Sequence, residues 1–221
     1  MGNTHYPCFK CLHLFKSNEL NIVTIHGHNV PVCNKCKEKL NKEKIVEFES
    51  FNKISRLSRE IVITEKLDGT NAQLFITEDG EFLTGSRKRW VTPKDDNYGF
   101  SRWAHEHKDA LMELGVGRHY GEWWGQGIQR KYGLTEKRFS LFNTHRWGEE
   151  RPTCCDVVPV LYQGMFDTVK IDEVLADLAE HGSYASEGFM NPEGIVIFHT
   201  HGKLLFKKTI KDDGVPKSLF K

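Results

Sequence analysis

The stretch IVITEKLDGTNAQLFIT, residues 61–77, contains two β-rich runs joined by a polar turn. Ile61–Glu65 and Ala72–Thr77 are apolar and β-branched, so each predicts a strand. Between them, Asp68-Gly69 is a turn dipeptide. Lys66 therefore stands at a strand end on a tight turn, where its side chain can point into a cleft. Taken alone this indication is weak, because a lysine before an Asp-Gly turn is also common in ordinary hairpins.

Further along the chain, strand signals come in pairs. Phe82–Ser86 follows the turn residues Glu78-Asp79-Gly80, which predicts a hairpin with the preceding strand. Gly194–His199 and Lys203–Lys208 predict a second hairpin, whose turn would be Thr200-His201-Gly202.

Two segments have the spacing of amphipathic helices. Trp103–Leu114 stops at Gly115, and Ile171–His181 stops at Gly182, the position where glycine often ends a helix. Strand pairs with interspersed helices, and no regular strand–helix alternation, predict an α+β domain of antiparallel sheets with flanking helices. We expect it to occupy residues 46–221.

Four of the six cysteines form two Cys-x2-Cys pairs near the N-terminus: Cys8, Cys11, Cys33 and Cys36. Each pair supplies two thiolates from one turn, and the chain between the pairs can run out and back as a hairpin. In an intracellular protein such pairs indicate zinc before disulfides, and two matched pairs disfavour a redox dithiol. We predict a zinc-ribbon-like module with structural Zn²⁺ over residues 1–45, followed by a short charged helix at Lys37–Lys44.

The predicted module is basic. Residues 1–45 contain seven lysines and three glutamates, a net +4 in a chain whose total charge is +1. Such a module suits an accessory that approaches phosphates, although a lysine-rich soluble surface explains the charge equally well. No apolar run approaches the roughly 18 residues of a membrane span, and no signal-peptide pattern opens the chain. We expect a soluble, cytoplasmic monomer.

Common nucleotide-binding and hydrolase motifs are absent: the sequence has no G-x-x-x-x-G-K-[ST], H-E-x-x-H, G-x-S-x-G or complete dinucleotide fingerprint. Four other short segments follow residues 65–71 in order: GEWWG at 121–125, FSLFN at 139–143, EGIVI at 193–197 and FKKT at 206–209. Together they resemble the nucleotidyltransferase motifs of the ATP-dependent polynucleotide ligase and RNA-capping superfamily, over about residues 60–217. Asn71 after Gly-Thr is most similar to the RNA ligase branch, because DNA ligases usually carry arginine near that point.

This resemblance implies roles for three central residues. Lys66 is the nucleophile that attacks the α-phosphorus of ATP, expels pyrophosphate and keeps AMP through a P–N bond. Because a lysine with an ordinary pKa of about 10.4 is a poor nucleophile at neutral pH, its site must favour the amine. Glu122 corresponds to the ribose-binding glutamate, and Glu193 to a carboxylate that organises Mg²⁺ or Mn²⁺.

The resemblance also implies nucleotide contacts at Glu65, Asn71, Arg87 and Phe142. Glu65 would lie on the adenine side, Arg87 would contact phosphate with its guanidinium fork, and Phe142 would stack on adenine. Each has a structural alternative: a strand-end carboxylate, a solvated basic strand end and a core aromatic residue. The family usually has aspartate after the phenylalanine, and Asn143 weakens any charged role there.

The last hairpin allows a prediction about phosphate contacts. With a three-residue turn, Ile195 faces Lys207, Glu193 is diagonal on the same face, and Lys208 points the other way. Glu193 and Lys207 would then converge on one cleft, with Lys207 neutralising phosphate. Lys217 is a further candidate for such a contact.

The implied activity is that of an RNA ligase: AMP is taken up, passed to a 5′-phosphate end, and displaced by a 3′-hydroxyl. The chain stops soon after the last motif, which leaves no room for a C-terminal OB domain and argues against RNA capping. One alternative is the same chemistry on a DNA or RNA–DNA hybrid nick. Another is a zinc-dependent nucleic-acid-binding protein on an inactive fold, which retention of Lys66, Glu122, Glu193 and Lys207 disfavours.

Overall fold

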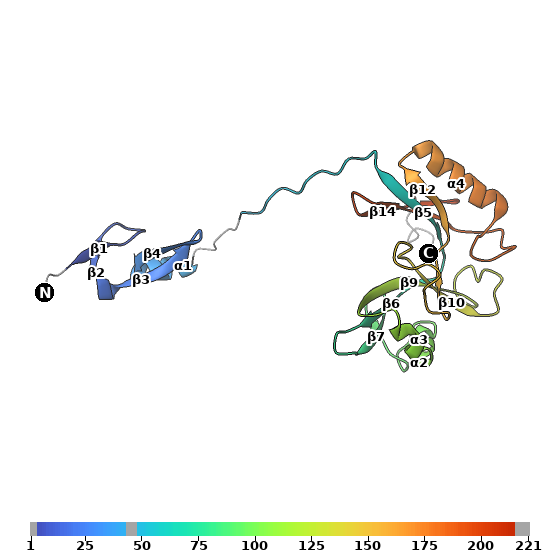
Figure 1. Ribbon diagram of the computed structural model, residues 1–221, viewed down its shortest axis with the longest axis horizontal. Helices are drawn as coiled ribbons and strands as arrows, with labels where there is room; N and C mark the ends of the chain where they lie inside the picture. The colour runs from blue at the N-terminus through green and yellow to red at the C-terminus, as the bar shows by residue number, and fades with distance from the viewer. Residues whose placement is uncertain (1–3, 43–47, 215–221) are drawn as a thin grey trace. The chain divides into compact units, whose positions relative to one another are not determined.

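The computed structural model describes residues 4–42 and 48–214 (Figure 1). Contacts divide the chain into two units, Met1–Lys53 and Ile54–Lys221. The domain boundary predicted near residue 45 lies outside the described residues. None of the described helices is long and apolar enough to cross a membrane.

Residues 4–42 of the N-terminal unit form two small antiparallel strand pairs, a short 3-10 helix (Ser17–Glu19) and one α-helix. The elements are β1 (His5–Pro7), β2 (Leu14–Lys16), β3 (Leu20–Ile25), β4 (His28–Cys33) and α1 (Asn34–Lys42). β3 and β4 form the expected hairpin, closed by His26 and Gly27 at positive φ, as a tight two-residue turn requires. α1 begins before the predicted Lys37, and its predicted last residues, 43–44, lie outside the described residues.

The larger unit is built on two sheets, and the predicted α+β class is confirmed. A six-stranded sheet has the order β11-β10-β9-β6-β7-β8, and a four-stranded sheet has the order β12-β5-β13-β14. All neighbouring strands are antiparallel except β10 and β11. The first sheet comprises β6 (Thr70–Ile76), β7 (Phe82–Ser86), β8 (Trp90–Val91), β9 (Gly117–Gly125), β10 (Lys137–Leu141) and β11 (Asp156–Val157). The second comprises β5 (Glu60–Lys66), β12 (Val160–Met165), β13 (Gly194–His199) and β14 (Leu204–Thr209).

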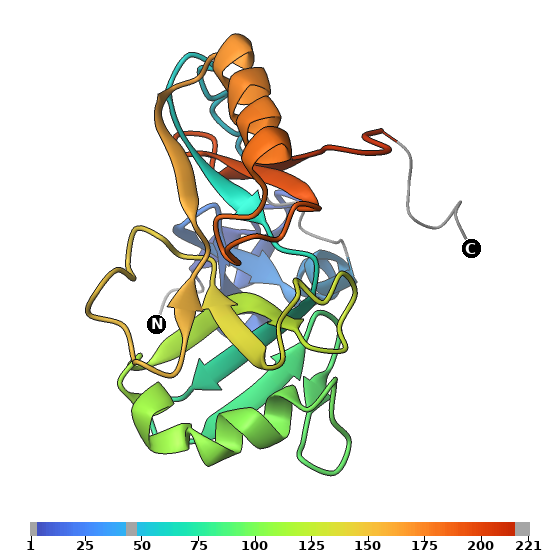
Figure 2. The same cartoon turned by 90° about the vertical axis from the view of Figure 1, so that its right-hand side faces the viewer.

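Helices cover one face of each sheet (Figure 2). α2 (Phe100–Glu106) and α3 (Lys108–Met112) pack on the six-stranded sheet, and α4 (Thr168–His181) packs on the four-stranded sheet. Side chains alternate along β6, so Leu74 is buried under the helices while Gln73 points to the opposite face. We call that opposite side of the six-stranded sheet the open face.

Two predicted elements need correction. Trp103–Leu114 is not one helix, because the chain leaves helical geometry at His107, with φ −106° and ψ 19°, between α2 and α3. The turn of the last hairpin has four residues rather than three, since Lys203 joins it at φ +51°. The added residue shifts the pairing by one, so Ile195 faces Lys208 and Val196 faces Lys207.

The chain passes from one sheet to the other through Leu67, Asp68 and Gly69, between β5 and β6. A Cβ atom at Gly69 would lie 2.4 Å from the Trp123 carbonyl oxygen and 2.7 Å from Trp124 Cβ. Only glycine fits this crossing without displacing β9. The residues that flank the crossing, Lys66 and Asn71, are therefore fixed at the junction of the two sheets.

Candidate active site

Lys66 and Glu193 form an ion pair at this junction. Lys66 ends β5 and pairs with Gly194 at the start of β13. This pairing brings Lys66 next to Glu193, which is 127 positions away in the sequence. Lys66 Nζ lies 2.5 Å from Glu193 Oε2, and the two side chains are 23% and 2% exposed. Gly194 has φ +155°, and a Cβ atom there would lie 2.2 Å from the Lys208 carbonyl oxygen. Gly194 therefore allows β13 to lie close to β14, directly next to Glu193.

Glu122 approaches the same turn from β9. Its Oε1 accepts a hydrogen bond from the Gly69 N–H at 3.0 Å, and its Oε2 accepts one from Asn71 Nδ2 at 3.1 Å. Burial raises the pKa of Glu122 to about 7, against the opposing effect of the Lys66 charge. Glu122 and Asn71 are directly paired across β9 and β6 and share the open face.

Two residues that the sequence did not single out hold the other side of the turn. Arg130 Nε donates to Asp68 Oδ2 at 2.9 Å, and Arg130 Nη1 donates to the Asn191 carbonyl at 3.2 Å. The Tyr132 hydroxyl accepts a hydrogen bond from the Asp68 N–H at 2.9 Å. Both residues come from the loop after β9, and no local pattern connects them to residues 66–71. The site thus combines one lysine, an arginine and three carboxylates around a single turn.

Glu65 lies beside Lys66 in the chain but on the opposite face of β5. Its buried carboxylate accepts hydrogen bonds from Ser183 Oγ at 2.6 Å, Tyr184 N at 2.9 Å and Ala185 N at 3.0 Å. Burial raises the pKa of Glu65, and these donors oppose the rise. Glu65 ties the end of β5 to the loop after α4.

Arg87 and Phe142 are exposed, and each lies one residue beyond the end of a strand. Arg87 follows β7 in the turn that the Ser86 N–H closes by donating to the Arg89 carbonyl oxygen. Phe142 continues the register of β10 opposite Tyr120, which assigns it to the open face. Phe142 follows β10 and donates its N–H to the Tyr120 carbonyl; its side chain is 41% exposed. Among the described residues Arg87 has no ion pair, whereas Arg89, two residues further along, binds Asp95 through two hydrogen bonds.

Lys207 and Lys208 point to opposite faces of β14. Lys208 forms an ion pair with Asp172 of α4. Lys207 pairs with Val196 and therefore shares the face of Lys66, from which it lies about 12 Å away by strand spacing. The Ile210 N–H donates to the Glu193 carbonyl oxygen, so Glu193 lies opposite Ile210, three residues beyond Lys207 in the chain. The observed register, which differs from the predicted one, thus puts Lys207 rather than Lys208 on the face of Lys66. Lys217 lies outside the described residues.

The four N-terminal cysteines form a compact cluster. The sulfur atoms of Cys8, Cys11, Cys33 and Cys36 all lie within 4.8 Å of one another, which suits tetrahedral Zn²⁺ with Zn–S bonds of about 2.3 Å. Burial and hydrogen bonds with neighbouring thiols raise the pKa of Cys36 to about 12. Burial also opposes ionisation of Cys8, yet backbone donors such as the Cys33 N–H lower its pKa to about 6. Four thiolates this close need a cation to offset their repulsion, so the residues fit zinc.

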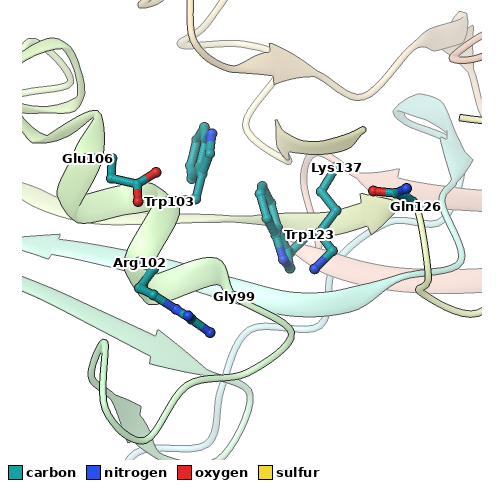
Figure 3. Close-up of a pocket in the computed structure, with 7 residues that line it drawn as sticks. All are labelled: Gly99, Arg102, Trp103, Glu106, Trp123, Gln126 and Lys137. Atoms are coloured by element: carbon teal, nitrogen blue, oxygen red, sulfur yellow. The ribbon is translucent and has the colours of Figure 1, made fainter. Parts of the chain in front are cut away.

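A shallow pocket of about 400 Å³ lies on the helix-covered side of the six-stranded sheet, away from Lys66 (Figure 3). Figure 3 shows Lys137 beside Trp123, and both donate to the Tyr98 carbonyl oxygen. Trp123 alternates with Glu122 along β9, so the pocket and the Glu122 carboxylate are on opposite faces. The pocket contains none of the predicted site residues.

Comparisons with known proteins agree with this arrangement of two sheets. The family model described as RNA ligase matches residues 59–211. A comparison with curated protein sequences finds no match. The chain is similar to solved structures of Naegleria gruberi RNA ligase variants. One variant has AMP and Mn bound (TM-score 0.54, 15% identity, 91% of this chain and 76% of that one), and another has ATP and Mn (TM-score 0.53, 15%, 91% and 77%). An apo variant aligns with TM-score 0.52 and 16% identity over 91% and 76% of the chains.

The two sheets, with Lys66 where the chain passes between them, have the fold of the nucleotidyltransferase superfamily to which RNA ligases belong. Because the family model spans most of the larger unit, the chain belongs to the RNA ligase family.

Proposed function

We propose that this protein is an ATP-dependent RNA ligase that takes up AMP on Lys66. The observation that carries the proposal is the ion pair of Lys66 with the buried Glu193, at the turn that Glu122 binds through Gly69. A lysine at a sheet junction, partly exposed and held between carboxylates, is in the position of a nucleophile rather than of a surface charge.

In the first step, the Lys66 amine would attack the α-phosphorus of ATP. A P–N bond forms, the bond to the bridging oxygen breaks, and pyrophosphate leaves. Glu193 Oε2, at 2.5 Å from Nζ, is the acceptor best placed to orient the amine and receive its proton. The Asp68–Arg130 pair and Tyr132 keep the turn beneath Lys66 in place.

Glu193 and Glu122 are the carboxylates that would hold Mg²⁺ or Mn²⁺, because such ions bind through one or two carboxylates together with substrate phosphates. When bound, the ion supplies positive charge that neutralises phosphate and favours the neutral amine of a neighbouring lysine. The Mn-bound Naegleria gruberi structures support a divalent ion in this family.

The remaining nucleotide contacts follow from the faces on which residues lie. Asn71 and Glu122 would bind the ribose side, Phe142 would stack on adenine, and Arg87 and Lys207 would contact phosphates. The Glu65 carboxylate already accepts three hydrogen bonds from residues 183–185. Glu65 would therefore act on the adenine side indirectly, by holding this loop in place.

The later steps would transfer AMP to a 5′-phosphate end and join that end to a 3′-hydroxyl, with RNA as the favoured substrate. The N-terminal unit would bind one Zn²⁺ and contribute basic charge to nucleic-acid binding. Paired zinc thiolates fit the reducing cytoplasm, where we expect the protein to act as a monomer.

Incubation with α-labelled ATP and magnesium tests the proposal. We expect the native protein to become covalently labelled and Lys66→Ala to remain unlabelled, because the variant lacks the amine that would form the P–N bond. Lys94→Ala is the matched control, since Lys94 is exposed and remote from the ion pair in sequence and sheet. Labelling of Lys66→Ala equal to the control would refute the assignment, and sealing assays on matched RNA and DNA nicks would identify the substrate.

A further inference from the structure

Beyond Glu122 and Asn71, the open face of the six-stranded sheet continues as a row of exposed rings. Register places Phe142, Tyr120, Gln73, Gly85 and Trp90 side by side on consecutive strands from β10 to β8. Tyr120 is 51% exposed and Trp90 is 46% exposed. Three large aromatic side chains thus remain accessible on one face, directly next to the row that contains Glu122.

In the next row, the Arg118 guanidinium lies against two aromatic rings, those of Phe75 and Trp90. Arg118 pairs with Phe75, and its guanidinium carbon lies 4.2 Å from the Phe75 ring centre and 5.4 Å from that of Trp90. The two rings lie 6.3 Å apart with an interplanar angle of 22°. Arg118 Nη1 also donates to Gln73 Oε1 at 3.2 Å. These contacts fix the cation and the rings before any ligand arrives, which lowers the entropic cost of binding.

A purely structural explanation covers part of this arrangement. The Trp90 ring lies over Gly85, where a Cβ atom would come 3.1 Å from Trp90 Cε3, so the indole shields a strand backbone that has no side chain. Shielding does not account for Tyr120, whose ring is half exposed and two strands away from Gly85.

We propose that this face, with Tyr120, Trp90 and Arg118 as its contact residues, binds a single strand of RNA as it approaches Lys66. Aromatic rings stack on bases without sequence preference, and arginine binds the phosphates between them. Neither of these two rows contains an aspartate or glutamate and the second contains Arg118, so the two rows suit a polyanion. Tyr120 and Trp90 lie three strands apart, about 14 Å, which allows two bases of one strand to stack separately. The proposal rests on the RNA ligase function.

The test measures binding of a fluorescein-labelled single-stranded RNA of about ten nucleotides by anisotropy, together with AMP labelling. We expect Tyr120→Ala and Trp90→Ala each to weaken RNA binding by roughly fivefold or more, and Trp90→Phe to restore most of it. Arg118→Ala should also flatten the dependence of binding on salt concentration. Tyr98→Ala is the matched control, because Tyr98 is equally exposed but its carbonyl binds residues of the helix-covered side.

The two readouts separate this proposal from the proposed function. Loss of RNA binding with AMP labelling retained supports the RNA-binding face. Unchanged RNA binding in the alanine variants overturns it, as does an equal loss in Tyr98→Ala. A change of oligomeric state in the variants, with RNA binding intact, also overturns it and indicates a protein partner instead. Absence of AMP labelling from the native protein would count against the ligase function. RNA binding by the native protein and the alanine variants would still show whether this face binds RNA.

Discussion

At the level of single residues, the carboxylates near Lys66 differ in how burial and charge act on them. Glu193 is paired with the lysine itself at 2.5 Å. Glu122 is buried against the turn, where two N–H donors favour its ionised form and the loss of water opposes it. Because burial is the larger effect, Glu122 is the group whose protonation the fold favours near neutral pH.

This difference predicts a pH dependence of stability. The pKa of Glu122 rises from 4.5 to about 7 in the folded protein, so between these pH values the folded state binds a proton that the unfolded state has lost. The free energy of unfolding should therefore fall as pH rises from about 4.5 to 7, by up to roughly 3 kcal/mol from this group. Urea unfolding across this range should show a weaker fall in Glu122→Gln.

The matched control is Glu78→Gln, which changes an exposed carboxylate in the β6–β7 turn. It should keep the pH dependence of the native protein. An identical slope in Glu122→Gln and the native protein, measured without ATP or metal, would contradict the elevated pKa.

At the level of elements, β14 distributes two adjacent lysines between two environments. The face that carries Lys208 packs toward α4, where Asp172 binds it. The alternate face, with Lys207, is shared with Lys66 of β5. One strand therefore separates a lysine that binds α4 from one that shares the face of Lys66.

We predict different effects of removing the two lysines. Lys207→Ala should slow AMP labelling at least about tenfold, because a cation that neutralises phosphate in the transition state is lost. Lys208→Ala should change the free energy of unfolding by no more than about 1 kcal/mol, as for other exposed ion pairs, and leave labelling near the native rate. Single-turnover labelling and urea unfolding measure both effects. If AMP labelling slows equally in the two variants, the face of β14 on which a lysine lies does not determine whether it assists labelling.

At the level of the whole molecule, the two units are stabilised in different ways. The larger unit has extensive apolar clusters under its helices. The buried cluster of the N-terminal unit consists of Val32 and three cysteines, with partly buried side chains around them. Because this apolar core is so small, we predict that metal binding supplies much of the stability of this unit.

Removal of the metal should therefore affect the units separately. We expect elemental analysis to find one zinc per chain in the native protein and none in Cys33→Ser, which should also bind RNA more weakly and with a flatter salt dependence. AMP labelling should remain, because its residues all lie in the larger unit. Cys154→Ser, outside the cluster, should keep its zinc and serve as control. Parallel loss of labelling and binding in Cys33→Ser would instead mean that the module only stabilises the enzyme.

Local patterns in the sequence were sufficient for several elements and for selecting the candidate site residues, whose roles stay predictions. β-branched runs and turn residues predicted β7 and β13 with their observed bounds, because a strand that buries one face selects its side chains within a few positions. The Cys-x2-Cys pairs predicted the sulfur cluster for a similar reason, since each turn brings two ligands together. Lys66 was identified from its strand end and the order of motifs around it.

Tertiary structure decided what depends on residues far apart in the chain. The extra turn residue Lys203 set the register of β14, and one residue of register determines which lysine faces Lys66. Arg130 meets Asp68 only because the loop after β9 folds back over the turn. The aromatic row, assembled from residues 90, 120 and 142, exists only once β8, β9 and β10 are in one sheet. Local sequence patterns do not predict which residues become neighbours in this way, because hydrogen bonds between strands that are distant in the sequence bring them together.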